Sequence, residues 1–193
     1  YYHDRLVCTL SAMLALAEND DEQDIERIER ARDGLEKVVR PLASSSVIET
    51  IAGELLIPVL LKQAEEIGVI TRWDDPELQR LNQLRKAKFK MLPNGAINRY
   101  LTLAFTSEIA GEDGDHILAI DNLQEPNGSI ANSPSATAYY ALQINPGDKA
   151  ALAYLENWLQ DDGGIQNAAP FDVFEVAWTL RNLHLTGDLS DEV

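Results

Sequence analysis

Apolar residues recur at helical spacing along almost the whole chain, and this periodicity limits the fold more than any other feature. In residues 22–39, for example, five apolar side chains form one predicted buried stripe: Ile25, Ile28, Leu35, Val38 and Val39. No segment combines strict apolar–polar alternation with a hairpin turn, as paired β-strands would require. We therefore predict an all-α chain.

Capping signals place the ends of several predicted helices. Ser46-Val47-Ile48-Glu49 is typical of a capping box, in which the Ser and Glu side chains bind free backbone amides. Asp75 followed by Pro76 predicts another helix start, because proline is tolerated at the first helical position. We predict helices over residues 3–17, 22–39, 46–67, 75–90, 95–108, 114–123, 134–142, 147–159 and 170–185.

The C-terminal half contains an internal repeat. The segment 123–130, Leu-Gln-Glu-Pro-Asn-Gly-Ser-Ile, is echoed by the segment 159–165, Leu-Gln-Asp-Asp-Gly-Gly-Ile. Each copy is followed by an asparagine and then by a proline that opens the next predicted helix. Repeated helix pairs of this length stack into a solenoid or close into an α/α barrel, and two copies do not decide between these arrangements.

Charge and composition exclude several classes of partner. Acidic residues outnumber basic residues by 32 to 16, which gives a formal net charge of −16. Nucleic acids and anionic membranes bind clustered basic surfaces, so we expect neither as a partner. We find no apolar run near the roughly 20 residues of a membrane span, and we recognise no signal peptide. We expect the single Cys8 to be a packed core thiol, and the protein to be cytoplasmic.

One acidic motif has two interpretations. Residues 20–24, Asp-Asp-Glu-Gln-Asp, match a DDxxD pattern that binds magnesium when its carboxylates face a cavity. Carboxylates in the first turn of a helix also cap free amides and complement the helix dipole. Because this stretch is polar throughout and lies at a helix start, we predict capping rather than metal binding.

Glu54 lies in a helical stretch that is otherwise apolar from Leu55 to Leu61, apart from Pro58. Pro58 lacks an N–H, so the helical bond to the Glu54 carbonyl cannot form, and we expect the helix to kink there. The carboxylate and the freed carbonyl are oxygen ligands of the kind that magnesium prefers. The alternative is a structural helix in which Glu54 pairs with a lysine or arginine.

Residues 85–90, Arg-Lys-Ala-Lys-Phe-Lys, form the only basic run of the chain. Its lysines could bind a diphosphate as point charges. The alternative is a solvated helix end that the helix dipole favours. We expect Trp73, Trp158 and Trp178 to be core or interface anchors.

Segments along nearly the whole chain, in this order, resemble the γ domain of copalyl diphosphate synthase-like class II diterpene cyclases. The N-terminal half resembles the family's YHDRLV, GFE-x3-P, YDxP and LKLxxIP at residues 2–7, 52–58, 73–76 and 88–93. The C-terminal half resembles GSF, SPxxTAY and PVDLFExxW at residues 128–130, 133–139 and 170–178.

The resemblance implies an incomplete α/α barrel of helical hairpins, formed by residues 1–193 as one γ domain of a longer βγ or αβγ enzyme. The chain begins at Tyr1 without an initiator methionine, and we expect it to be a piece of such a protein. The implied reaction is the protonation-initiated cyclisation of geranylgeranyl diphosphate to a copalyl-type bicyclic diphosphate. The implied acid is the middle aspartate of a DxDD motif in the β domain of the same polypeptide. This chain contains no DxDD, so we expect no catalytic residue in it and no activity of the chain alone.

The resemblance also implies two site residues. The glutamate of the GFE segment, proposed to bind Mg²⁺, corresponds to Glu54, and the lysine that faces the diphosphate corresponds to Lys88. The chain departs from the family at two nearby places: residues 43–46 replace an acidic stretch, and Gly53 replaces an aromatic residue.

Two alternative functions remain open at this point. A triterpene cyclase or prenyltransferase-like subunit would contain aromatic QW-type repeats or zinc ligands, whereas Ile130 and Ile165 stand here in place of tryptophan. A non-catalytic helical-repeat scaffold that binds a protein partner would have polar surfaces at both ends and an exposed groove. The cyclase hypothesis instead predicts a large apolar face that another domain covers.

Overall fold

The computed structural model describes residues 2–18, 21–42, 52–71 and 75–187. Every regular element in these parts of the chain is a helix, which confirms the all-α prediction. The chain forms two compact units. The first contains Tyr1–Asn94 and Ile109–Ile117, and the second contains Gly95–Glu108 and Leu118–Val193. No helix in the described ranges is both long enough and apolar enough to cross a membrane.

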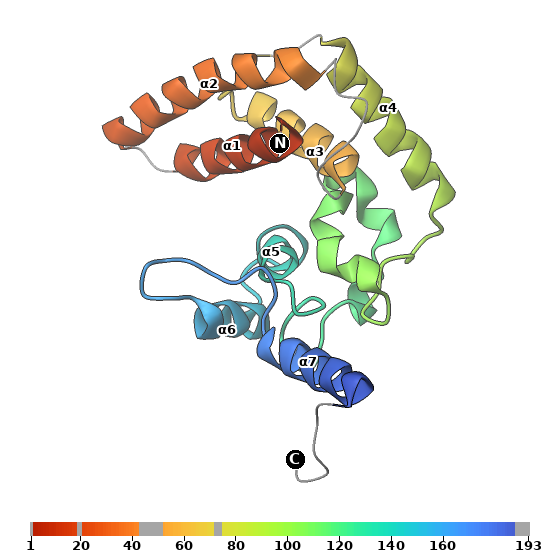
Figure 1. Cartoon of the computed structure of the whole chain (residues 1–193). Coiled ribbons are helices and arrows are strands. Elements are labelled where there is room, and N and C mark those ends of the chain that lie inside the picture. Colours follow the sequence, from red (N-terminus) through yellow and green to blue (C-terminus); the bar gives the residue numbers. More distant parts are fainter. Residues whose placement is uncertain (1, 19–20, 43–51, 72–74, 188–193) are drawn as a thin grey trace. The chain divides into compact units, whose positions relative to one another are not determined.

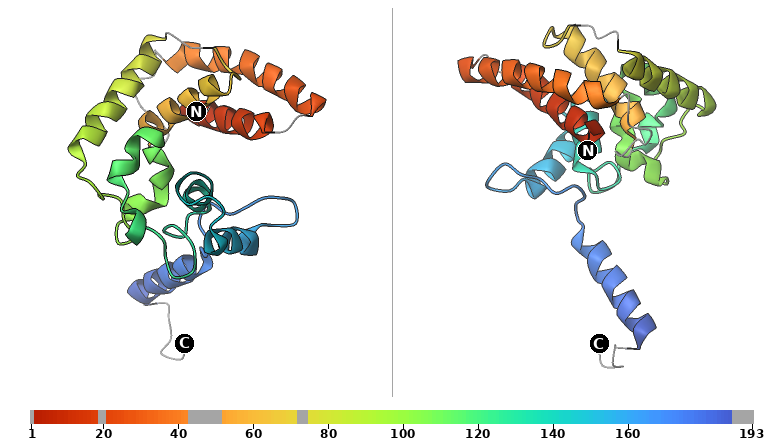
Figure 2. Two further views of the ribbon diagram at one scale, coloured as in Figure 1. Left: turned by 180° about the vertical axis from the view of Figure 1, so that it is seen from behind. Right: turned by 45° about the horizontal axis from the view of Figure 1, so that its top comes forward.

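The first unit is built around four α-helices (Figure 1): α1 (Tyr2–Ala17), α2 (Glu22–Leu42), α3 (Gly53–Glu66) and α4 (Pro76–Met91). Helix α1 packs against α2 and α3, and α3 packs against α4, as both views of this unit in Figure 2 also show. The core between them is aliphatic and includes Leu6, Leu10, Met13, Leu35, Ile57, Leu61, Leu78 and Leu81.

The buried stripe of α2 is confirmed at Ile28, Leu35, Val38 and Val39. Ile25 is 55% exposed, so its predicted burial is wrong. Asp24, one position earlier, is only 7% exposed, so the buried face of α2 already includes this turn. Ile25 is turned about 100° from Asp24 and lies at the edge of that face.

Cys8 is exposed, so its predicted place in the core is also wrong. The buried side chains of α1 include Leu6, Leu10 and Met13, which lie three and four residues apart. At about 100° per residue, Cys8 is turned roughly 200° from Leu6 and lies on the other side of the helix. When only one side of a helix is buried, an apolar stretch longer than one turn also places apolar side chains on the exposed side.

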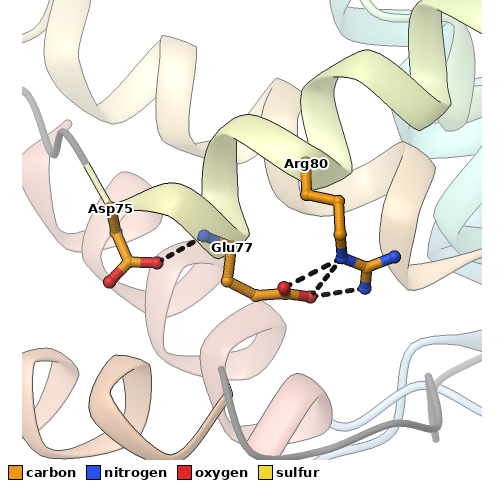
Figure 3. A network of polar contacts seen from close by, with 3 residues as sticks. All are labelled: Asp75, Glu77 and Arg80. Atoms are coloured by element: carbon orange, nitrogen blue, oxygen red, sulfur yellow. Dashed lines mark hydrogen bonds and ion pairs between the residues drawn. The ribbon is translucent and has the colours of Figure 1, made fainter.

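The predicted start of α4 is confirmed. The Asp75 side chain accepts a hydrogen bond from the Glu77 N–H at 2.8 Å, and Pro76 takes the first helical position. One turn later, Arg80 binds the Glu77 carboxylate (Figure 3). The predicted capping box at residues 46–49 lies outside the described residues, and the described part of α3 begins at Gly53.

The acidic motif at the start of α2 caps the helix, as predicted. The Gln23 N–H donates to Asp21 Oδ1 at 2.8 Å, and Asp24 forms an ion pair with Arg27 at 2.9 Å. Asp20 lies outside the described residues. Asp21 and Asp24 thus both bind groups of α2 itself.

The second unit contains α5 (Pro134–Tyr139), which continues into a π-helical turn at Tyr140–Ile144, followed by α6 (Lys149–Trp158) and α7 (Asp172–Thr186). The predicted α-helices over 95–108 and 114–123 are wrong. These stretches contain 3₁₀ turns at Thr102–Ala110, Glu112–Ile117 and Ile120–Asn122. Backbone bonds join distant parts of the stretch instead: the Arg99 N–H donates to Asn122 C=O and the Ala119 N–H to Ile97 C=O.

The internal repeat is confirmed at the level of hydrogen bonds. The Gly128 N–H donates to Glu125 C=O and the Gly163 N–H to Gln160 C=O, both at 2.9 Å. Both glycines have positive φ angles, +88° and +83°. The two copies therefore use the same tight turn before their second helix.

Candidate functional site

Glu54 and Lys88, predicted separately as ligands for a cation and a diphosphate, are bonded to each other. Glu54 lies in the first turn of α3 and Lys88 in the last turn of α4. Because these two helices pack together, Lys88 Nζ reaches Glu54 Oε1 and donates a hydrogen bond to it. The fold thus joins two charged side chains 34 positions apart.

The two members of this pair differ in exposure. The Glu54 side chain is 10% exposed, whereas the Lys88 side chain is 54% exposed. The carboxylate is therefore embedded in the first unit, while the lysine remains open to solvent. A ligand that approaches this pair meets Lys88 first.

Glu54 is ionised at neutral pH. Burial opposes the charged carboxylate and by itself would raise the Glu54 pKa. The hydrogen bond from Lys88, a backbone hydrogen bond and the positive charge of Lys88 act in the other direction, and the pKa of Glu54 lies below its ordinary value. The pair is consequently a carboxylate and an ammonium group whose charges balance.

Arg85 holds α4 to the start of α3. Its guanidinium donates to the carbonyls of Leu55, Ile109 and Ala110, the first of these at 3.0 Å. The residue is 2% exposed, and the guanidinium lies 4.0 Å from the centre of the Phe89 ring. Leu55 follows Glu54 directly, so this arginine positions the backbone beside the ion pair.

The alternative of a solvated helix end does not hold for Arg85, which is 2% exposed. Lys86 and Lys90 are exposed as expected, but Arg85 lies on the buried stripe of α4 with Leu78, Leu81 and Phe89. Their spacings of three and four residues provide a signal that could have identified the buried arginine. Its charge concealed that signal, because a charged residue is almost never fully buried unless it is paired or hydrogen-bonded.

A magnesium ion at Glu54 would need further oxygen ligands. Within the described ranges, no group of three or more His, Cys, Asp or Glu residues could hold a metal. Glu54 offers one carboxylate, and one of its oxygens accepts from Lys88. Magnesium is commonly bound by one or two carboxylates together with substrate phosphates. The described residues therefore fit an ion that a diphosphate brings with it, and they do not fit an ion held by the protein alone.

His3 is a buried polar side chain in the same unit that the sequence analysis did not single out. It is 1% exposed, and both ring nitrogens lack a hydrogen-bond partner within the described part of the chain. Burial lowers the pKa of the ring, so His3 is neutral at pH 7.

The second unit has a buried carboxyl group of its own. Glu108 Oε1 accepts a hydrogen bond from Ser135 Oγ at 3.0 Å, while Oε2 is buried without a partner among the described residues. Burial raises the pKa of Glu108 above its ordinary value, although backbone and Ser135 hydrogen bonds oppose this shift. Glu108 therefore holds its proton to a higher pH in the folded chain than in the unfolded chain.

We expect Glu108→Gln to stabilise the chain at pH 7 and to have little effect at pH 4. Because the pKa is raised on folding, the unfolded chain loses this proton first as the pH rises, and wild-type stability falls between the ordinary and the raised pKa. The amide mimics the neutral acid and avoids this loss, which is about 1.4 kcal/mol for each unit of pKa shift. Urea unfolding at both pH values measures the difference.

The exposed Glu156 on α6 provides the control for this prediction. Glu156→Gln should change the free energy of unfolding by about 0.5 kcal/mol or less at either pH. A Glu108→Gln variant that is less stable than wild type at both pH values would show that the carboxylate itself is favourable in the fold.

Comparison with known proteins now places the chain. It matches no family model. Over 98% of its length it is 38% identical to the Type B diterpene cyclase of Mycobacterium tuberculosis, and it spans 39% of that protein. Over 96% of its length it is 31% identical to a chloroplastic ent-copalyl diphosphate synthase of Zea mays, of which it spans 22%. The chain is homologous to part of the class II diterpene cyclases.

A solved structure confirms the fold of this segment. Abietadiene synthase from Abies grandis matches with a TM-score of 0.74 and 23% sequence identity, over 92% of this chain and 23% of that protein. The chain thus has the helical fold of a class II terpene synthase segment, and the resemblance to copalyl diphosphate synthase-like diterpene cyclases is confirmed. It spans between 22% and 39% of the diterpene cyclases and synthases named above.

Proposed function

We propose that the chain is the γ domain of a class II diterpene cyclase whose full polypeptide converts geranylgeranyl diphosphate to a copalyl-type bicyclic diphosphate. The observation that carries this proposal is the similarity to the mycobacterial Type B diterpene cyclase, which extends over 98% of the chain. The reaction would begin with protonation of the substrate by a DxDD aspartate of the β domain. Since this chain contains no DxDD, we propose that it is inactive alone.

In this proposal the first unit binds the diphosphate end of the substrate. Lys88 is an exposed ammonium group held at the end of α4, and a compact ammonium is a suitable donor to phosphate oxygens. Glu54 would supply one carboxylate oxygen to a Mg²⁺ ion shared with the diphosphate. When bound, the ion would neutralise part of the phosphate charge.

The exposed apolar side chains of α7 support the proposed β domain as a partner. Trp178 and Leu185 lie seven positions apart, on the same side of the helix, and are 54% and 66% exposed. A soluble protein rarely leaves a contiguous apolar surface uncovered, and such surfaces mark interaction sites. We propose that the β domain of the same polypeptide covers α7, with Trp178 as an interface anchor.

We expect Lys88→Ala in the full polypeptide to raise the KM for geranylgeranyl diphosphate about tenfold or more, with a smaller effect on kcat. Hydrogen bonds to charged groups contribute roughly 1.5–3 kcal/mol, and 1.4 kcal/mol corresponds to a factor of ten in affinity. Initial rates over a range of substrate concentrations, with the product identified by gas chromatography and mass spectrometry, provide the measurement.

Lys86→Ala is the matched control, because Lys86 is an exposed lysine on the same helix. It should leave both kinetic constants unchanged. A Lys88→Ala enzyme with normal KM and kcat would remove the diphosphate role from Lys88. A full polypeptide that forms no bicyclic diphosphate from geranylgeranyl diphosphate would refute the proposed reaction.

A further inference from the structure

We propose that the groove between α1 and α2 binds an anionic amphiphile, a single apolar chain that ends in one carboxylate or phosphate group. The two helices pack against each other in the first unit (Figure 1), and a groove of about 520 Å³ remains open along their contact. Small-molecule sites in proteins commonly have volumes of about 300–1,000 Å³. The groove belongs to α1 and α2, whereas Glu54 and Lys88 lie on α3 and α4, so its ligand need not be the substrate of the proposed cyclisation.

The floor of the groove is apolar. Ala12, Met13 and Leu16 line it from α1, and Ala31 lines it from α2. Ala12 is exposed, and Leu16 and Ala31 are half-buried, so water contacts apolar surface here. A hydrocarbon chain laid over this surface removes it from water, which is favourable. The floor therefore suits the apolar part of an amphiphile.

Gly34 lies in the interior of α2 and lines the same groove. Glycine is among the least favourable residues in the interior of a helix. A Cβ at this position would meet no atom within 4 Å in the described part of the chain, and the backbone angle is not one that only glycine adopts. Neither close packing nor backbone geometry thus explains the glycine. The missing side chain keeps the groove open, and we attribute it to the space that a ligand occupies.

Two arginines supply positive charge to the groove. Arg27 and Arg30 line it, and their side chains are 54% and 69% exposed. Arg27 donates one hydrogen bond to Asp24, and Arg30 lies 3.9 Å from the exposed Glu26. Because a guanidinium carries five N–H donors in a planar fork, both arginines have further donors for a carboxylate or phosphate. None of the described residues that line the groove is acidic, although the chain has a net charge of −16.

The order of these residues along α2 sets the orientation of the ligand. Arg27 and Arg30 come first, and Gly34 follows one helical turn after Arg30. With a rise of 1.5 Å per residue, the distance along the helix from Arg27 to Gly34 is about 10 Å. An anionic head bound to the arginines therefore directs its chain along Ala31 toward Gly34.

Calorimetric titration of the 193-residue chain with decyl phosphate, below the concentration at which it forms micelles, measures this binding. We expect one ligand to bind to each chain. Decanoate should bind through the same arginines, and the tighter of the two anions identifies the head group that the groove prefers. 1-Decanol lacks the charge and inorganic phosphate lacks the chain, so each should bind about tenfold more weakly or less.

Cys8 reports where the ligand binds, because it is the only cysteine, is exposed and lines the groove. Decyl phosphate should slow the reaction of this thiol with a disulfide reagent in proportion to occupancy, with the dissociation constant that calorimetry gives. Inorganic phosphate at the same concentration should leave the rate unchanged. A rate that decyl phosphate does not change would overturn the assignment to this groove.

Matched variants test the two halves of the site. Gly34→Leu places a side chain in the groove and should lose binding, whereas Ser11→Leu adds the same side chain at an exposed position of α1 outside the groove and should bind normally. Arg30→Gln should weaken binding about tenfold, and Arg5→Gln, on the exposed surface of α1, should not.

Leucine is a good helix former, so Gly34→Leu should fold, and circular dichroism verifies this for each variant. Wild type that does not bind decyl phosphate, or Gly34→Leu that binds it as tightly as wild type, overturns the proposal. Equal affinity for decyl phosphate and 1-decanol overturns the role of the arginines and with it the anionic ligand. None of these measurements involves cyclisation by the full polypeptide, so their failure leaves the proposed function intact.

Discussion

Replacing Arg85 with methionine is expected to lower the free energy of unfolding of the first unit by about 3–5 kcal/mol, because three backbone carbonyls lose their donor at once. Methionine keeps most of the packing of the arginine stem. It removes the donors to the carbonyls of Leu55, Ile109 and Ala110. A buried carbonyl that loses its donor typically costs about 1–3 kcal/mol, so the effect comes from polar groups more than from lost volume.

Urea unfolding followed by circular dichroism measures this loss, and two variants control it. Lys86→Met replaces the neighbouring exposed lysine and should change stability by about 0.5 kcal/mol or less. Arg85→Lys keeps the charge but replaces a planar fork of donors with one ammonium, which cannot reach carbonyls from two separate segments equally well. It should therefore lie between wild type and Arg85→Met. A loss below about 1 kcal/mol in Arg85→Met would mean that these carbonyls find other donors.

The helices of the first unit were predictable because their signals are local. Asp75 and Pro76 mark the start of α4, and the aliphatic stripe of α2 has a regular period of three and four residues. Each of these features depends on neighbours within one or two helical turns. Packing between the helices stabilises these segments, and it leaves them helical as their local sequence predicts.

The stretch between α4 and α5 could not be predicted in this way. Its apolar residues are spaced like those of a helix, but its backbone amides bond to distant carbonyls, as Arg99 does to Asn122 and Ala119 to Ile97. Gly111, in the middle of this stretch, has a φ of +56°, which a regular right-handed helix does not accept. Hydrogen bonds between distant residues take the place of the i to i−4 bonds of a helix here. The two partners of each bond are too far apart in the sequence for a helical pattern to reveal them.

The candidate site was predictable in its members but not in their relation to one another. Glu54 was conspicuous as a carboxylate in an apolar helix, and Lys88 as part of a basic run in an acidic chain. Their contact requires α3 and α4 to pack at one register, which the core and Arg85 determine together. A sequence that suggests two separate ligand-binding residues can therefore encode an ion pair between them.

Gly128→Ala is expected to destabilise the second unit by about 2–5 kcal/mol. The φ of Gly128 is +88°, and an L-residue in a left-handed conformation costs roughly 1–2 kcal/mol. The new Cβ would also overlap the carbonyl of Ala150 in α6, with its carbonyl carbon only 2.7 Å away. Overpacking adds about 1–3 kcal/mol, and here the obstacle is backbone that cannot rotate away as a side chain can.

The internal repeat supplies a matched control for Gly128. Gly163 occupies the same turn of the other copy with a φ of +83°, but a Cβ there would meet nothing within 4 Å. The two turns also share a side-chain bond: Asn127 and Asp162 each accept the backbone N–H two residues later. Gly163→Ala should therefore cost only the conformational term of about 1–2 kcal/mol. Urea unfolding measures the free energy of unfolding of both variants. The difference between them is the cost of the steric overlap between the Gly128 turn and α6. Equal losses in both would show that this turn withdraws from α6 without cost and that the glycine is required for its backbone angle alone.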